Sequence, residues 1–186
     1  MNLAKFRKVQ VIASTLTFCL VFVYFFLTSP RVFTDIQLSF WGVHSSHSWL
    51  WNSIVSVLAI SMFINVHHYL WSFEKLKMRK HLIRLFGIVS IALFLTGAFN
   101  ANFFIVHNAS AFFYFFMCPL AIFLISHFNS KNMSYAAWKN HILFSVAILC
   151  IPISLLFFFK GMAISESVHS FLILLWNYYI LNENSK

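Results

Sequence analysis

Long apolar stretches alternate with short polar segments along this chain, and the alternation predicts its elements. A helix that crosses the hydrocarbon layer of a membrane needs about 20 apolar residues, because each residue rises about 1.5 Å along the helix axis. Six stretches reach that length: Val9–Thr28, Trp49–Trp71, Leu82–Asn100, Phe103–Phe128, His141–Phe159 and Ala163–Leu181. We therefore expect an all-α, polytopic membrane protein, in which residues 1–186 form one bundle of six transmembrane helices.

The composition also favours a fold that is embedded in lipid. The 186 residues are 61% hydrophobic and 9% charged, whereas about 25% of the residues of a soluble domain are charged. So few charges cannot cover a globule in water, which argues against an ordinary soluble domain. Lys5, Arg7 and Lys8 precede the first apolar stretch, as in a secretory signal. That stretch is longer than the usual signal core and no small-x-small cleavage site follows it, so we expect a span.

The basic residues predict the orientation of the bundle, because cytoplasmic loops of membrane proteins carry an excess of lysine and arginine. With the N-terminus inside, all 13 lysines and arginines except Arg31 and Lys160 fall on the cytoplasmic side. Asp35 and Glu166 balance those two, so the net charge of +9 is entirely cytoplasmic. We expect both termini to lie in the cytoplasm. We expect the protein to reside in a bacterial inner membrane, or alternatively in an organellar membrane. We therefore expect the basic run Glu74–Arg84 to fix the orientation of the helices in the membrane, with binding of anionic lipid as the alternative role. We expect no nucleic-acid partner.

Polar residues gather at the predicted outer surface, and we interpret them as a site. They are His107 and Asn108 at the start of the fourth stretch, Glu166 and His169 in the sixth, and Asp35 and His44 in the first outer loop. Residues three apart share one face of a helix, and an ionisable residue inside a span is a functional hypothesis by default. The alternative is that these groups are interfacial and wetted by water or headgroups, with Glu166 paired to Lys160.

The remaining cysteines and histidines do not predict a metal site or a cofactor. Cys19, Cys118 and Cys150 are odd in number, lack a CxxC spacing and lie in apolar runs, so we expect them to be buried as small hydrophobic residues. Paired histidines on membrane helices can hold haem, but those of the inner face lie at predicted helix ends: His67, His68, His81, His127 and His141. We expect neither haem nor a metal ion.

Short segments of the chain resemble a known family. The first outer loop contains DIQLSFWG, and LTGAF (Leu95–Phe99) precedes HNASAFFYFF (His107–Phe116). This pattern resembles the Frag/DRAM/Sfk superfamily of six-span membrane proteins, which includes autophagy modulators, proteins that remodel GPI-anchor lipids, and uncharacterised bacterial relatives. The matching positions are Ser39, Gly42, Gly97, Phe99, His107 and Ala111. The loop lacks the acidic residue that many eukaryotic members place after the serine, so the resemblance implies a fold and a lipid-associated role rather than a remodelling reaction.

Together these features predict a protein that associates with membrane lipids and binds a headgroup at the outer polar site. A histidine beside a carboxylate would suit acyl transfer or hydrolysis, but no recognisable serine or cysteine nucleophile accompanies it, so we expect binding rather than catalysis. The alternative is a non-catalytic scaffold that engages another membrane protein through its aromatic helices. A haem-binding electron carrier is less well supported, because the inner histidines lie at predicted helix ends. A transporter is also less well supported, since charge is nearly absent from the centres of the spans.

Overall fold

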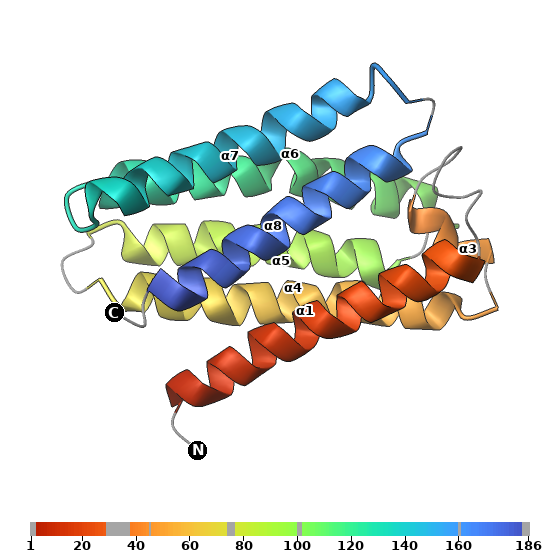
Figure 1. The fold of residues 1–186 in the computed structure, drawn as a ribbon, viewed down its shortest axis with the longest axis horizontal. Coiled ribbons are helices and arrows are strands. Elements are labelled where there is room, and N and C mark those ends of the chain that lie inside the picture. Colours follow the sequence, from red (N-terminus) through yellow and green to blue (C-terminus); the bar gives the residue numbers. More distant parts are fainter. Residues whose placement is uncertain are drawn as a thin grey trace.

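The described part of the chain is entirely helical (Figure 1). The computed structural model describes residues 3–28, 38–44, 46–73, 77–99, 102–159 and 161–183. Five of its helices are long and apolar enough to cross a membrane, which indicates an integral membrane protein. They are α1 (Leu3–Thr28), α4 (Ser48–Trp71), α5 (Arg79–Ala98), α6 (Phe104–Asn129) and α7 (Tyr135–Leu155). A 3₁₀ turn, η1 (Leu38–Phe40), and the short helix α3 (Trp41–His44) lie between α1 and α4.

The sixth predicted span forms a helix of different character, α8 (Ala163–Glu183). It has 21 residues but is not among the five helices that are apolar enough to cross a membrane on composition alone. Its polar side chains Ser165, His169 and Asn177 are buried against other helices, so it does not need an apolar surface all round. The six-span count therefore remains a prediction.

Helices that follow one another along the chain pack side by side, and α8 closes the bundle. α4 contacts α5, α5 contacts α6, and α6 contacts α7. α8 crosses obliquely and contacts α7, α4 and α1 (Figure 1). α1 begins and α8 ends at the same end of the bundle, where α4 leads to α5 and α6 leads to α7 (Figure 1).

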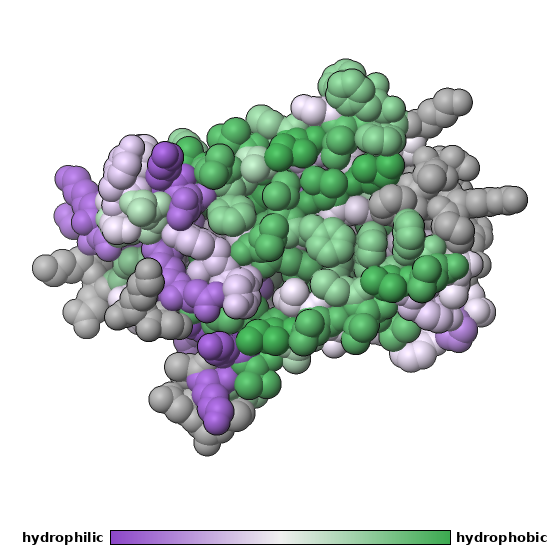
Figure 2. Space-filling view, in the orientation of Figure 1, coloured by the Kyte–Doolittle hydropathy of each residue, from purple (hydrophilic) through white to green (hydrophobic). Residues whose placement is uncertain are grey.

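We call this the basic end, because exposed lysines gather there. They are Lys5, Lys8, Lys77, Lys80, Lys131 and Lys139. Figure 2 shows hydrophilic side chains concentrated at this end and hydrophobic ones over the middle of the same face. Large exposed apolar areas are rare on soluble monomers, so this band agrees with contact to lipid. The membrane side on which the basic end lies remains a prediction.

Close packing within the bundle depends on a glycine of α5. A Cβ atom added at Gly97 would lie 2.7 Å from Ser56 Oγ and 2.8 Å from the carbonyl oxygen of Asn52 on α4. A side chain at this position would therefore push α5 away from α4. Small residues commonly allow such approaches between membrane helices, which gives a physical reason for the glycine that the family resemblance singled out.

Two expectations about individual residues are wrong. α7 begins at Tyr135 rather than at His141, so His141 lies in its second turn, where it is 0% exposed. Cys118 is buried, but Cys150 is exposed on α7, because the apolar run that contains it faces outward at that position.

Candidate functional site

Four of the six predicted site residues line one cavity of about 200 Å³ between α6, α7 and α8. His107 and Asn108 come from the first turns of α6, and Glu166 and His169 from the first turns of α8. A second cavity of about 100 Å³ extends toward α4, and His107 and Glu166 line it as well. Both helices start at the end of the bundle opposite the basic end (Figure 1). The fold thus brings together polar residues from segments that are far apart in the sequence.

The other two predicted residues, both in the first loop, are not shown to reach this cavity. Asp35 lies outside the described residues, and His44 is the last residue of α3. The loop meets the site through its backbone instead, because the Leu38 N–H donates a hydrogen bond of 2.6 Å to Glu166 Oε2. Glu166 therefore anchors the start of η1 on α8.

The neighbouring α3 is held on α4 by a side-chain hydrogen bond and by aromatic packing of Trp41 on Trp51, with ring centroids 4.9 Å apart. Asn52 Nδ2 donates to the Gly42 carbonyl at 3.0 Å, and a Cβ atom at Gly42 would overlap the Asn52 amide. The buried Trp41 stacks on Phe25, with ring centroids 5.5 Å apart. Packing thus explains Gly42, one of the positions at which the chain resembles the family. Asn52 is a residue that the sequence did not indicate.

The buried imidazole of His107 has a defined proton position. Its Nδ1 lies 2.8 Å from the carbonyl oxygen of Phe99, the C-cap residue of α5. Carbonyls at the end of a helix have no partner within the helix, and a carbonyl can only accept. Nδ1 must therefore carry the proton, which leaves Nε2 of the neutral ring as an acceptor.

The imidazole of His169 also has its Nδ1 against a backbone carbonyl, in this case one that a proline has left without a helical donor. Pro152 has no N–H, so the carbonyl of Ile148, four residues earlier in α7, loses its helical donor. His169 Nδ1 replaces that donor at 3.1 Å from the Ile148 oxygen. The ring of Phe115 stacks on the imidazole with centroids 4.0 Å apart and holds it in place.

The second nitrogen of His169 is left without a partner. The residue is 1% exposed, and its Nε2 makes no hydrogen bond within the described part of the chain. An unsatisfied buried polar atom costs about 1–3 kcal/mol. Eight other buried side-chain atoms of the described residues are in the same state, but none of their residues lines either cavity. His169 therefore places a free hydrogen-bond acceptor in a residue of the cavity wall.

The rim of the larger cavity is apolar, in contrast to its polar end. Phe112 and Phe116 on α6 and Ile153 and Leu156 at the end of α7 line it. All four side chains are also exposed on the outside of the bundle, Phe112 by 55%. The cavity therefore has a buried polar end and an apolar rim at the surface that faces lipid. Within the described ranges, no group of three His, Cys, Asp or Glu side chains is placed to hold a metal ion.

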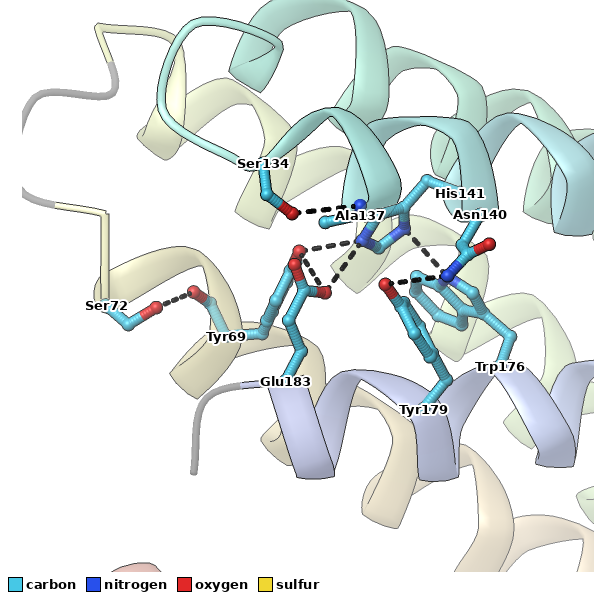
Figure 3. A network of polar contacts seen from close by, with 9 residues as sticks. All are labelled: Tyr69, Ser72, Ser134, Ala137, Asn140, His141, Trp176, Tyr179 and Glu183. Atoms are coloured by element: carbon cyan, nitrogen blue, oxygen red, sulfur yellow. Dashed lines mark hydrogen bonds and ion pairs between the residues drawn. The ribbon is translucent and has the colours of Figure 1, made fainter. Parts of the chain in front are cut away.

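A second polar cluster, which sequence reasoning missed, lies near the basic end (Figure 3). Trp176 Nε1–H donates to His141 Nδ1 at 3.0 Å. The Tyr69 hydroxyl lies 2.7 Å from His141 Nε2 and donates to Glu183 Oε2 at 3.0 Å. Tyr69, His141 and Trp176 are each 0% exposed.

The donors and acceptors of this cluster have one consistent direction. An indole N–H can only donate, so His141 Nδ1 is unprotonated and Nε2 carries the proton of the neutral ring. Nε2–H then donates to the Tyr69 oxygen, and the Tyr69 hydroxyl donates to Glu183. His141 also lies 3.3 Å from Glu183 Oε2, but an imidazolium would lose the bond from Trp176. The one signal in the sequence was the seven-residue spacing of Trp176 and Glu183, which places both on one face of α8.

Comparison with protein-family models, with characterised proteins and with solved structures found no match. The resemblance to the Frag/DRAM/Sfk superfamily therefore stays a prediction.

Proposed function

We propose that this protein binds a membrane lipid in the cavity between α6, α7 and α8. The polar group of the lipid lies against His107, Glu166 and His169, and its hydrocarbon part stays in the bilayer. The observation that carries the proposal is the combination of a buried, unpartnered His169 Nε2 with a rim of lipid-facing apolar side chains.

The size of the cavity supports a ligand that is only partly enclosed. An engineered cavity of about 150 Å³ binds one benzene molecule, so a volume of about 200 Å³ accommodates a small polar group with a few attached carbons. The rest of a lipid would lie along the exposed Phe112 and Phe116 of α6 and Ile153 of α7. A ligand that diffuses within the bilayer reaches this rim directly.

The chemistry of the wall favours binding over catalysis. The larger cavity is lined by one described hydroxyl side chain, that of Ser165. Its Oγ donates to the Pro152 carbonyl at 2.8 Å rather than to a histidine. A serine nucleophile needs a base within hydrogen-bond distance, and Ser165 does not have this arrangement.

Lipid retention after purification tests the proposal. Ala111 lines both cavities, so Ala111→Leu fills space that the ligand would occupy. Ala13 is exposed in the middle of α1, which makes Ala13→Leu a matched control. We expect wild type and Ala13→Leu to retain a lipid after purification in mild detergent, measured by mass spectrometry of the extract per mole of protein, and Ala111→Leu to lose it.

Thermal unfolding of all three proteins shows whether the substitutions leave the fold intact. Equal lipid content in three folded proteins would contradict the proposal and favour a non-catalytic scaffold. A lipid that is lost from Ala13→Leu as well would show that retention does not report on the cavity.

A further inference from the structure

Two imidazoles and a carboxyl group line the polar end of the larger cavity, together with one side-chain amide, that of Asn108. His107 and His169 each use Nδ1–H on a backbone carbonyl, at 2.8 Å and 3.1 Å respectively. Their Nε2 atoms are therefore lone-pair acceptors. Glu166 adds a carboxyl group, one oxygen of which already accepts from the Leu38 N–H. A ligand that satisfies these atoms must bring protons with it.

The same wall is unsuited to an anionic headgroup. None of the described residues that line either cavity is a lysine or an arginine. Phosphate groups in proteins are held by such cations or by N–H donors. Among the described residues that line the larger cavity, the Asn108 amide is the one side-chain group with N–H donors that are not already used on a backbone carbonyl. A phosphate here would also face two imidazole lone pairs and the carboxyl group of Glu166, and burying a charge without a cationic partner is strongly unfavourable.

We propose, on the basis of the lipid-binding function above, that the site takes the hydroxyl groups of an uncharged lipid alcohol and rejects phosphate headgroups. Each hydroxyl donates to one imidazole Nε2. Two such acceptors, on His107 and His169, predict that a lipid with two free hydroxyls, such as a monoacylglycerol, binds more tightly than a lipid with none.

Three probes with the same oleoyl chain separate the contributions. Monoolein has two hydroxyls, oleoyl lysophosphatidic acid has one hydroxyl and a phosphate, and methyl oleate has no donor. Binding of each to the purified full chain in detergent is measured by native mass spectrometry over a concentration series. We expect monoolein to bind at least about tenfold more tightly than methyl oleate, because methyl oleate leaves buried acceptors unpaired. We expect lysophosphatidic acid to bind no more tightly than methyl oleate.

The variant His169→Asn isolates the acceptor nitrogen. The amide N–H₂ of asparagine can occupy the place of Nδ1–H and donate to the Ile148 carbonyl, whereas nothing replaces Nε2. We expect this variant to lose most of the preference for monoolein over methyl oleate. The ratio is an internal comparison within one protein, so a modest loss of stability does not obscure it.

The outcomes distinguish failure of the hydroxyl assignment from failure of the lipid-binding function. Equal binding of all three probes would overturn the hydroxyl assignment and leave lipid binding in place. Tightest binding of lysophosphatidic acid would overturn it in favour of a phosphate site. No binding of any probe by a folded protein would contradict both the assignment and the proposed function. If His169→Asn does not fold, the preference among probes in wild type alone decides the assignment.

Discussion

Replacing Tyr69 by phenylalanine removes a single oxygen atom from the buried cluster near the basic end. That oxygen accepts a hydrogen bond from His141 at 2.7 Å and donates one to Glu183 at 3.0 Å. The ring of phenylalanine fills the same space, so the substitution tests the two hydrogen bonds rather than the packing.

The expected loss follows from what remains around the cluster. Without the hydroxyl, His141 Nε2–H has Glu183 Oε2 at 3.3 Å as an alternative acceptor, so the imidazole is not left wholly unpaired. A hydrogen bond contributes about 0.5–1.5 kcal/mol, and more when one partner is charged. We therefore expect Tyr69→Phe to lower the free energy of unfolding by about 2 kcal/mol. In a protein of this size that corresponds to a fall in Tm of about 4–8 °C.

Thermal unfolding in one detergent measures the change, with Tyr178→Phe as the matched control. Tyr178 lies on α8, is 48% exposed, and its hydroxyl makes no hydrogen bond within the described residues. We expect the Tm of Tyr178→Phe to equal that of wild type. A Tm for Tyr69→Phe within about one degree of the control would refute the inferred network, because the lost bonds would then contribute nothing measurable.

Two further predictions concern packing and topology. Gly97→Ala should lower the free energy of unfolding by about 1–3 kcal/mol because its Cβ meets α4 backbone. Gly87→Ala in the same helix meets only Phe63, at 3.4 Å, and should be neutral or stabilising, so equal melting of the two variants would count against the packing argument. Reporter fusions at the two termini should both be cytoplasmic, whereas a C-terminus on the other side would show that α8 does not cross the membrane.

Much of the candidate site could be anticipated from the sequence because polar residues are rare in this chain. His107, Asn108, Glu166 and His169 stand out against apolar surroundings, and all four line the same cavity. Their partners could not be anticipated. The backbone N–H of Leu38 and the ring of Phe115 carry no signal in a sequence of 25 phenylalanines, yet they orient Glu166 and His169 respectively.

The hydrogen-bond states of the histidines show where sequence reasoning ends. Pro152 alone reveals that the Ile148 carbonyl lacks a helical donor, but not that His169 supplies one from another helix. His141 looked like a residue at a helix end, whereas the contact of α7 with α8 buries it beside Trp176. Both outcomes depend on the rotation of one helix relative to its neighbour.

The sequence by itself determined that this chain forms long apolar helices, and it predicts that their cationic connections lie on one side of a membrane. Transfer of a side chain from water to lipid depends mainly on that side chain, so its free energy can be summed along the chain. The tertiary structure alone decided which polar atoms meet and which buried ones have no partner among the described residues. Hydrogen bonds require a separation of about 3 Å and a suitable angle, and only the packing of α6, α7 and α8 brings His107 and His169 to the same cavity.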